Sequence, residues 1–324
     1  MELKGFGAAT INFEQIRKVV EVLRALPPDN AVLTFSEPAD MYPEVGDPHA
    51  IDFFFLSSAF NYGFWYGDRN GYREPLFGEI AAKRLKGSDL LYRSLMRAFR
   101  ADRSVLSPKF LADVTPAQFA RMFSDDHGPI PFPDLETRFG IARAYGQWFL
   151  DNHVTPAQMV VRANESSRPL QWFIASTAEV PGYDQDHPFD KKNMLLAMAL
   201  ANRPEHFLKV TDHSHWQPLI DYHVLRVLLR LGIINLSSDA EETNKAREWA
   251  DAPDEEAIRE HAFIANLVLV QDSQQSMAMV DKALWMARRY CPELEKPQCE
   301  KCIFNLVCAK KIDLFQPVFR TTAY

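Results

Sequence analysis

The segment "DYHVLRVLLRLG", residues 221–232, has the pattern of a buried helix. Its apolar residues recur at helical spacing and form one stripe: Val224, Val227, Leu228 and Leu231. Asp221 stands directly before this stripe, where the helix dipole favours an anion and where a carboxylate can cap the first turn. The segment therefore predicts a helix that begins beside a negatively charged side chain.

Helical patterns also dominate the rest of the chain. Two helices are predicted from Thr-Pro starts, because threonine caps a helix and proline fits its first position. Helical spacing covers residues 88–99 (with Ser88 as the cap), 115–123, 133–150, 155–161 and 261–290. Alternating patterns are scarce, and the best strand candidates are "AVLTF" (31–35) and "QMVVRA" (158–163). We expect an all-α or nearly all-α protein.

Composition indicates a globular protein of 324 residues, of which 47% are hydrophobic. No apolar run reaches the roughly 18 residues of a membrane span, and "MELKGFGAAT" has no apolar signal-peptide core. We therefore expect a cytoplasmic protein without a membrane partner. The net charge of −7 weighs against duplex DNA as the main ligand, because phosphate contacts dominate such binding. The charge is uneven, since residues 281–324 hold eight basic and five acidic residues.

All four cysteines lie within "CPELEKPQCEKCIFNLVC", residues 291–308, with the spacing C-x7-C-x2-C-x5-C. Disulfides, a structural zinc site and an iron–sulfur cluster are the alternatives. A reducing cytoplasm disfavours disulfides, and zinc sites usually pair two short Cys-x2–4-Cys units where this chain has one. Four thiolates on a compact loop suit a cubane cluster, with zinc as the alternative. Neighbouring side chains could shield the cluster (Ile303, Phe304, Leu306, Val307) or offset its charge (Lys296, Lys301, Lys310, Lys311).

This loop resembles the iron–sulfur loop of endonuclease III-type DNA glycosylases, C-x6-C-x2-C-x5-C, with one extra residue in the first spacer. The segment at 221–232 is similar to the same superfamily's Asp-x-His-Val-x-Arg-Val-x-x-Arg-Leu-Gly helix. The resemblance implies a two-lobed helix-hairpin-helix glycosylase fold and a [4Fe–4S] cluster on Cys291, Cys299, Cys302 and Cys308. It also implies that Asp221 is catalytic, by stabilising a cationic sugar or orienting a water. The alternative is that Asp221 is only a helix cap.

The hairpin of that superfamily corresponds to "EVPGYDQDHPFDKK", residues 179–192. Only Pro181 and Gly182 match the turn that grips a DNA backbone, and the residues after them are more numerous and more acidic. Lys191 or Lys192 falls near the position of the lyase-type Schiff-base lysine. The alternative is that both are solvated lysines at a helix start.

Residues 50–324 resemble a second branch of this superfamily, the queuosine salvage proteins. "SSAFNYGFW" matches that family at Asn61, Phe64 and Trp65, and its catalytic Asp-Tyr pair matches Asp221 and Tyr222. The resemblance implies hydrolysis of queuosine 5′-phosphate. The aromatic side chains would stack on the base, although such a stretch is also typical of a hydrophobic core. This chain departs from the family in its cysteines and in the His that follows Asp-Tyr.

Together these patterns predict an N-glycosidase acting on a 7-deazaguanine or queuosine-type nucleotide. The alternative is a DNA base-excision glycosylase, with or without lyase activity. We divide the chain into a helical extension (1–50), a glycosylase-like body (51–290) with the aspartate helix at 221–233, and the cysteine loop and tail (291–324). Asp221 is the expected catalytic residue. The expected substrate-binding residues are Asn61, Phe64, Trp65, Lys191, Lys192, Tyr222 and His223.

Overall fold

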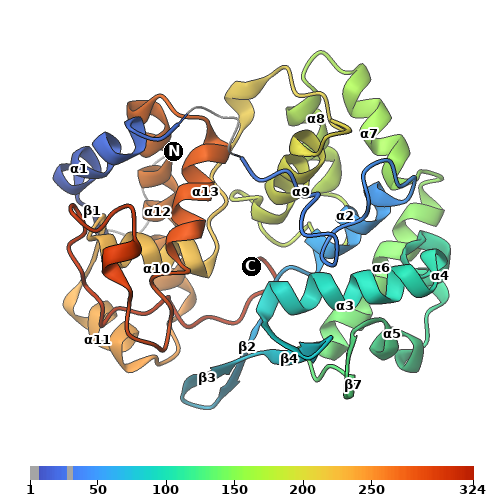
Figure 1. Cartoon of the computed structure of the whole chain (residues 1–324), viewed down its shortest axis with the longest axis horizontal. Coiled ribbons are helices and arrows are strands. Elements are labelled where there is room, and N and C mark those ends of the chain that lie inside the picture. The colour runs from blue at the N-terminus through green and yellow to red at the C-terminus, as the bar shows by residue number, and fades with distance from the viewer. Residues whose placement is uncertain (1–6, 28–31) are drawn as a thin grey trace. The chain divides into compact units, whose positions relative to one another are not determined.

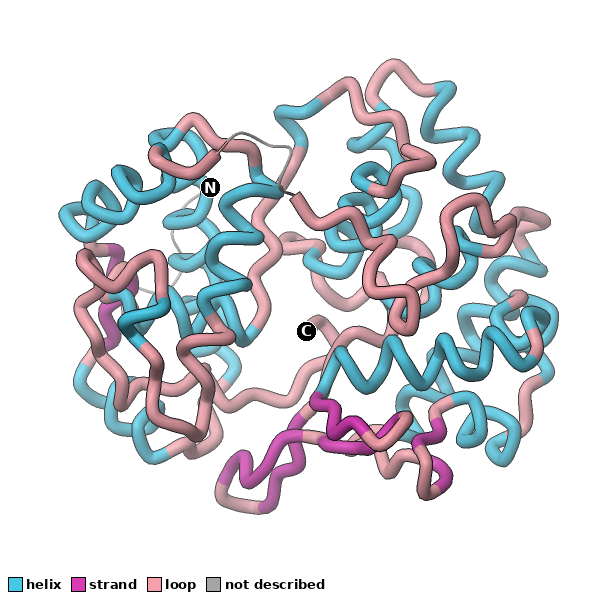
Figure 2. Tube along the Cα trace, viewed as in Figure 1, coloured by secondary structure: helices cyan, strands magenta, loops and turns pink. Residues whose placement is uncertain are grey.

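The computed structural model describes residues 7–27 and 32–324 of the chain (Figure 1). Residues 1–6 and 28–31 lie outside the described part, and with them parts of the predicted extension and the first residue of the candidate strand "AVLTF". The described residues are mostly helical with a few short strands (Figure 2), which confirms the predicted fold class. Among them, no helix is both long and apolar enough to cross a membrane.

Helix starts follow the sequence closely where a capping side chain is present. Thr115 and Thr155 each accept a hydrogen bond from the glutamine three residues later, and that glutamine bonds back to the threonine. Both capping boxes are followed by proline at the first helical position, as predicted. These local contacts explain why α5 and α7 begin where they do.

Two local predictions were wrong. Helix α3 begins at Gly87 after Lys86 and has no side-chain cap, so Ser88 is not its cap. The candidate strand at 158–163 lies inside α7, where the Thr155 capping box holds the chain helical. The segment 261–290 is mostly helical, as predicted, and it is divided at Gln274, whose φ of 59° is left-handed and ends α12 before α13 begins.

The chain forms two compact units, each built from segments that are distant in sequence. The C-terminal unit comprises Met1–Leu33, Gly67–Tyr72 and Gln217–Arg320. The central unit comprises Thr34–Tyr66, Arg73–Trp216 and Thr321–Tyr324. The predicted division at residues 50 and 290 describes successive stretches of sequence and stays a prediction.

The C-terminal unit contains β1 (Ala9–Ile11), α1 (Phe13–Arg24), α10 (Tyr222–Leu231), β8 (Ile234–Leu236), α11 (Ser238–Ala246), α12 (Ala252–Ser273), α13 (Met277–Ala287) and the 3-10 turn η4 (Cys299–Lys301). Strands β1 and β8 pair antiparallel, with Thr10 opposite Asn235. Helix α1 packs on α12, and α10 packs on α13. Every residue of α10 is buried, as its apolar stripe indicates, but so are its two arginines.

The central unit contains α2 (Ala50–Ala59), β4 (Phe77–Ile80), β5 (Lys83–Lys86), α3 (Gly87–Ala101), η2 (Arg103–Leu106), α4 (Pro108–Asp113), α5 (Pro116–Met122), β6 (Ser124–Asp125), β7 (Gly128–Pro129), α6 (Leu135–Asp151), α7 (Pro156–Glu165), α8 (Pro169–Thr177), α9 (Lys191–Asn202) and η3 (His213–His215). The hairpin strands β2 (Trp65–Asp68) and β3 (Gly71–Pro75) carry residues of both units.

Helix α6 packs closely against α4. It needs Gly146 because an added Cβ would lie 2.3 Å from the backbone nitrogen of Ala112 in α4.

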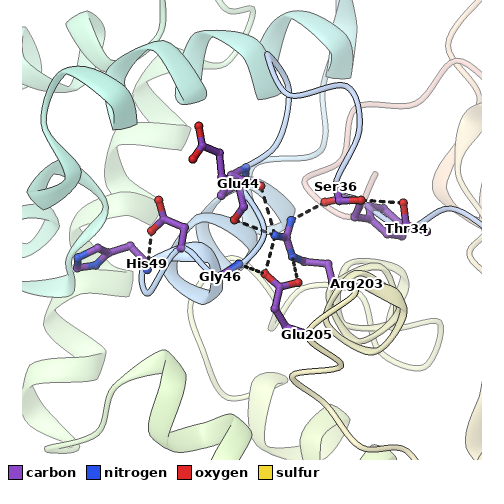
Figure 3. Close-up of polar contacts among 10 residues, drawn as sticks. Thr34, Ser36, Glu44, Gly46, His49, Arg203 and Glu205 are labelled. Carbon is purple, nitrogen blue, oxygen red and sulfur yellow. Dashed lines mark hydrogen bonds and ion pairs between the residues drawn. The ribbon is translucent and has the colours of Figure 1, made fainter.

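A buried arginine fixes the segment that precedes α2 within the central unit (Figure 3). The guanidinium of Arg203, which is fully buried, donates to the carbonyl oxygens of Phe35 at 2.6 Å and of Pro43 and Glu44 at 3.3 Å. Glu205 accepts from Arg203 at 2.8 Å and from the backbone N–H of Gly46 at 2.9 Å. We call these contacts the Arg203 clamp. It holds residues 35–46 without regular secondary structure.

Candidate functional site

Asp221 lies at the start of α10 as the sequence predicts. Its Oδ1 accepts a hydrogen bond from the backbone N–H of Val224 at 2.8 Å, which is a regular N-cap. The side chain is half-buried, and its second oxygen, Oδ2, accepts no hydrogen bond from the described residues. The cap therefore uses one carboxylate oxygen and leaves the other for a ligand.

Tyr222 and His223 follow Asp221 into a buried polar network. The His223 ring lies 4.1 Å from the Tyr222 ring, and its Nδ1 lies 3.3 Å from a carboxylate oxygen of Glu293. Burial, together with the positive charge of Arg288, lowers the pKa of His223 to about 4, so the imidazole is neutral at pH 7. The His223 ring thus contacts its helix neighbours and the cysteine segment. A role of His223 in substrate binding stays a prediction.

Two buried arginines of α10 hold the cysteine segment, residues 291–308. Arg226 forms an ion pair with Glu293 at 3.1 Å and donates to the carbonyl oxygen of Cys291 at 3.3 Å. Arg230 donates to the carbonyl oxygens of Pro292 and Leu314 at 2.8 and 2.7 Å. One helix thus carries Asp221 at its start and the anchors of the cysteine segment along its length.

All four cysteines are free thiols of intermediate exposure. Burial raises the pKa of Cys308, and the charges of the other three cysteines raise it further, so Cys308 lies within electrostatic reach of all of them. In residues 7–27 and 32–324, no three His, Cys, Asp or Glu side chains are placed to hold a metal ion. The donor set, four unpaired thiols gathered on one loop beside the Arg230 guanidinium, fits an all-thiolate centre in its chemistry.

The side chains expected to shield such a centre do not all do so. Phe304 is fully buried, but Ile303 is half exposed and Leu306 is 96% exposed. The expectation that Leu306 covers the cysteines was therefore wrong, because its side chain is exposed to solvent.

The predicted aromatic binding segment lies in the central unit and is mostly buried. Phe64 and Trp65 are 3% and 4% exposed. The guanidinium of Arg138 stacks on the ring of Tyr62 at 4.0 Å and donates to the carbonyl oxygen of Phe60 at 2.5 Å. Burial lowers the pKa of Arg138 to about 10. The segment is thus packed as a core element around a buried cation.

Lys191 and Lys192 are not solvated, although they begin α9. The ammonium group of Lys191 donates to the carbonyl oxygen of Asn61 at 3.3 Å. Lys192 is fully buried; its ammonium donates to the carbonyl oxygens of Ala59, at 3.2 Å, and Gly182. Burial, together with the positive charge of Lys191, lowers the pKa of Lys192 to about 7. The interpretation of these lysines as surface residues was therefore wrong.

The Tyr62 hydroxyl is a buried polar atom with no hydrogen-bond partner among the described residues. Burial raises the pKa of Tyr62 to about 12, so the hydroxyl is protonated. The ammonium group of Lys192 lies 5.1 Å from the ring centre. Because buried polar groups nearly always have a partner, such an orphan indicates a place for a ligand or a water.

The structure therefore gathers the predicted residues into two groups, one in each unit. Lys191 bonds Asn61, and Lys192 bonds Ala59 at the end of α2. Asp221 and Tyr222 directly precede His223, whose ring meets Glu293 of the cysteine segment. Sequence reasoning missed Arg138 as a member of the first group. Its signal is a cation within the apolar stripe of α6, in register with Ala142 and Tyr145, where a charge needs buried partners.

Among solved structures, the chain is similar to an endonuclease III trapped as a covalent intermediate with DNA, at 12% identity over 93% of this chain and 97% of that one, with a TM-score of 0.49. It is also similar to the 8-oxoguanine DNA glycosylase of Pyrobaculum aerophilum complexed with 8-oxoguanosine, at 15% identity over 91% and 96%, with a TM-score of 0.49. Comparison with curated proteins found no significant match.

The sequence profile of the queuosine salvage protein family matches residues 41–290. The match spans well over half of the chain, includes both Asn61 and Asp221, and ends directly before Cys291. It confirms the resemblance read from "SSAFNYGFW" and the Asp-Tyr pair. The chain belongs to the queuosine salvage protein family.

Proposed function

We propose that this protein is an N-glycosidase that hydrolyses the base–sugar bond of a queuosine-type, 7-deazaguanine nucleotide. The family match over residues 41–290 is the observation that carries this proposal. The acidic net charge of −7 also favours a small nucleotide over a nucleic-acid polymer.

Asp221 is the proposed catalytic carboxylate. In the hydrolysis a water oxygen bonds to the anomeric carbon, the bond from that carbon to the base nitrogen breaks, and the water proton ends on the departing base. Positive charge develops on the sugar as the bond breaks, and an ionised carboxylate stabilises it. Oδ1 of Asp221 is fixed by Val224, which holds the side chain in place while Oδ2 faces the reacting sugar or its water.

The central unit supplies the proposed binding residues. Tyr62 offers a protonated hydroxyl that lacks a partner among the described residues, and Lys192 offers an ammonium group whose pKa of about 7 makes its charge sensitive to a bound anion. Asn61, Phe64 and Trp65 are proposed to bind the base. Phe64 and Trp65 are almost fully buried, so each would meet the base with only a small exposed part of its ring.

We further propose that Cys291, Cys299, Cys302 and Cys308 hold a [4Fe–4S] cluster, with zinc as the alternative. Support comes from the four free thiols within one 18-residue segment and from the cationic anchor at Cys291. Such a cluster would cross-link the loop and supply a one-electron redox centre. The cluster would take no part in the hydrolysis itself.

The direct test incubates the purified protein with queuosine 5′-phosphate and, separately, with DNA duplexes that carry damaged bases. Release of the 7-deazaguanine base, followed by chromatography, is the expected result. Excision from DNA with the nucleotide left intact would replace this function by DNA base excision.

A second test uses the unpartnered hydroxyl. Tyr62→Phe removes it without changing the ring, so the free energy of unfolding should hold or rise, while substrate binding weakens by about tenfold. Tyr145→Phe is the matched control, because the Tyr145 hydroxyl is also buried and without a partner in the described part of the chain. Equal binding by both variants and the wild type would remove Tyr62 from the site.

A further inference from the structure

The central unit contains a cavity of about 330 Å³ whose charged lining the proposed function does not use. Three arginines of α3 line it: Arg93, Arg97 and Arg100. Their spacing of four and three residues places them on one face of the helix. Asp40 and Asp126 complete the charged lining, so the arginines exceed the carboxylates by one charge.

The two carboxylates orient Arg93 and Arg97 but do not use all of the N–H groups of these arginines. Arg93 bonds Asp40 through Nε at 2.9 Å, and Arg97 bonds Asp126 through Nη1 at 3.0 Å. Arg100 donates to the carbonyl oxygen of Ala39 at 2.6 Å. A guanidinium has five N–H groups in a rigid fork, so each arginine retains donors for a ligand after these contacts.

The walls of this cavity are built from fixed elements. Asp40 belongs to the segment that the Arg203 clamp holds, and Asp126 is bonded to the β4–β5 hairpin. Its backbone N–H donates to the carbonyl oxygen of Glu79 at 2.8 Å, and its Oδ2 accepts from the backbone N–H of Ala82 at 3.1 Å. A preorganised set of donors loses little conformational entropy when a ligand binds.

We propose that this cavity binds a phosphate-class dianion, either inorganic phosphate or the phosphoryl group of a phosphomonoester. Arginine forks match the tetrahedral oxygens of phosphate and form short, charge-assisted hydrogen bonds with them. The positive charge of Lys83 also acts on Asp40, which adds to the cationic field.

The cavity is separate from the aromatic binding segment. Helix α3 begins at Gly87, where an added Cβ would lie 3.5 Å from Phe64. Arg97 follows ten residues later, roughly 15 Å along the helix at 1.5 Å per residue. A phosphate held at Arg97 and Arg100 is therefore a second ligand, distinct from a base held at Phe64 and Trp65.

Titration calorimetry of the full chain at constant ionic strength tests the proposal, with inorganic phosphate as the first probe and glycerol 2-phosphate as the second. We expect a dissociation constant on the order of 1 mM, as befits a five-atom ligand. Arg97→Gln should weaken binding about tenfold, because it removes one charge-assisted contact. Tighter binding of glycerol 2-phosphate would identify a phosphomonoester as the ligand, and equal or weaker binding would identify free phosphate.

Asp126→Asn should change phosphate affinity in the opposite direction to Arg97→Gln. A purely structural role of these residues would not produce this difference. It keeps an oxygen for Ala82 but removes a negative charge from the cavity, so phosphate affinity should rise severalfold. Arg121→Gln, an exposed arginine of α5 outside the cavity, is the control and should leave affinity unchanged. Absence of phosphate binding up to about 10 mM, or an equal effect of Arg97→Gln and Arg121→Gln in folded variants, would overturn the site.

Discussion

Arg230 donates a hydrogen bond from Nη1 to the sulfur of Cys291 at 3.3 Å, from within the helix that Asp221 caps. The same guanidinium holds the carbonyl oxygens of Pro292 and Leu314, on either side of the remaining cysteines. Arg230 is 5% exposed, and these hydrogen bonds compensate for the burial of its charge. The cysteine segment is therefore attached to α10 by a buried cation.

Replacing this cation should weaken the C-terminal unit. Arg230→Leu leaves two carbonyl oxygens without a donor, and we expect the free energy of unfolding to fall by about 3 kcal/mol, in the range for hydrogen bonds to charged groups. Urea denaturation measures it. Arg17→Leu, at an exposed position of α1 in the same unit, should change stability by less than about 0.5 kcal/mol. Similar losses in the two variants would contradict the anchoring role.

The proposed cluster on the four cysteines can be tested by the iron content of the purified protein. Protein prepared without oxygen should contain about four irons per chain and absorb broadly in the visible blue, as a cubane cluster does. Cys302→Ser should lower both the iron content and the thermal midpoint. Elemental analysis decides the identity of the metal. One zinc per chain with no iron would establish the zinc alternative instead.

Asp221→Asn should separate catalysis from capping. Asparagine caps a helix about as well as aspartate, so stability should change by less than about 1 kcal/mol. Turnover should fall by roughly 10²-fold or more, because the charge opposite the cationic sugar is lost. The measurement is single-turnover base release at saturating substrate.

The matched control for this variant is Asp251→Asn. Asp251 also caps a helix, accepting from the backbone N–H of Asp254 at 2.9 Å, and lies exposed at the start of α12. It should show the same small change in stability with normal turnover. Near-normal turnover in Asp221→Asn would reduce Asp221 to a structural cap.

Lys192 should make stability depend on pH in the alkaline range. Its pKa is about 7 in the folded protein, against the ordinary lysine value of 10.5 in the unfolded chain. Between these values the unfolded state binds one more proton, so the free energy of unfolding rises with pH, by up to about 1.4 kcal/mol per unit. Below pH 7 both states are protonated and the contribution to the slope disappears.

Urea denaturation between about pH 7 and pH 9.5 measures this slope. Lys192→Met should flatten it, whereas Lys209→Met, at an exposed lysine of the same unit, should leave it unchanged. A slope that is equal in all three proteins would show that Lys192 keeps its proton when folded.

Features that depend on neighbouring residues could be predicted from the sequence. Thr115, Thr155 and Asp221 each bond a backbone N–H three residues away, so the cap and the helix it starts lie in one short stretch. The family, too, is visible in the sequence, because its motifs are local runs such as "SSAFNYGFW". Ser88 shows the limit of this reasoning, since a capping residue type does not act as a cap where the chain already turns helical at Gly87.

What the tertiary structure decided is the environment of the polar side chains. Lys192 bonds the carbonyl oxygen of Ala59, which is 133 positions earlier, and Arg138 bonds that of Phe60, 78 positions earlier. No local pattern encodes such pairs, and lysines at a helix start are ordinarily solvated. Burial arises only when distant segments exclude water together. It produces both the lowered pKa of Lys192 and the Tyr62 hydroxyl that has no partner among the described residues.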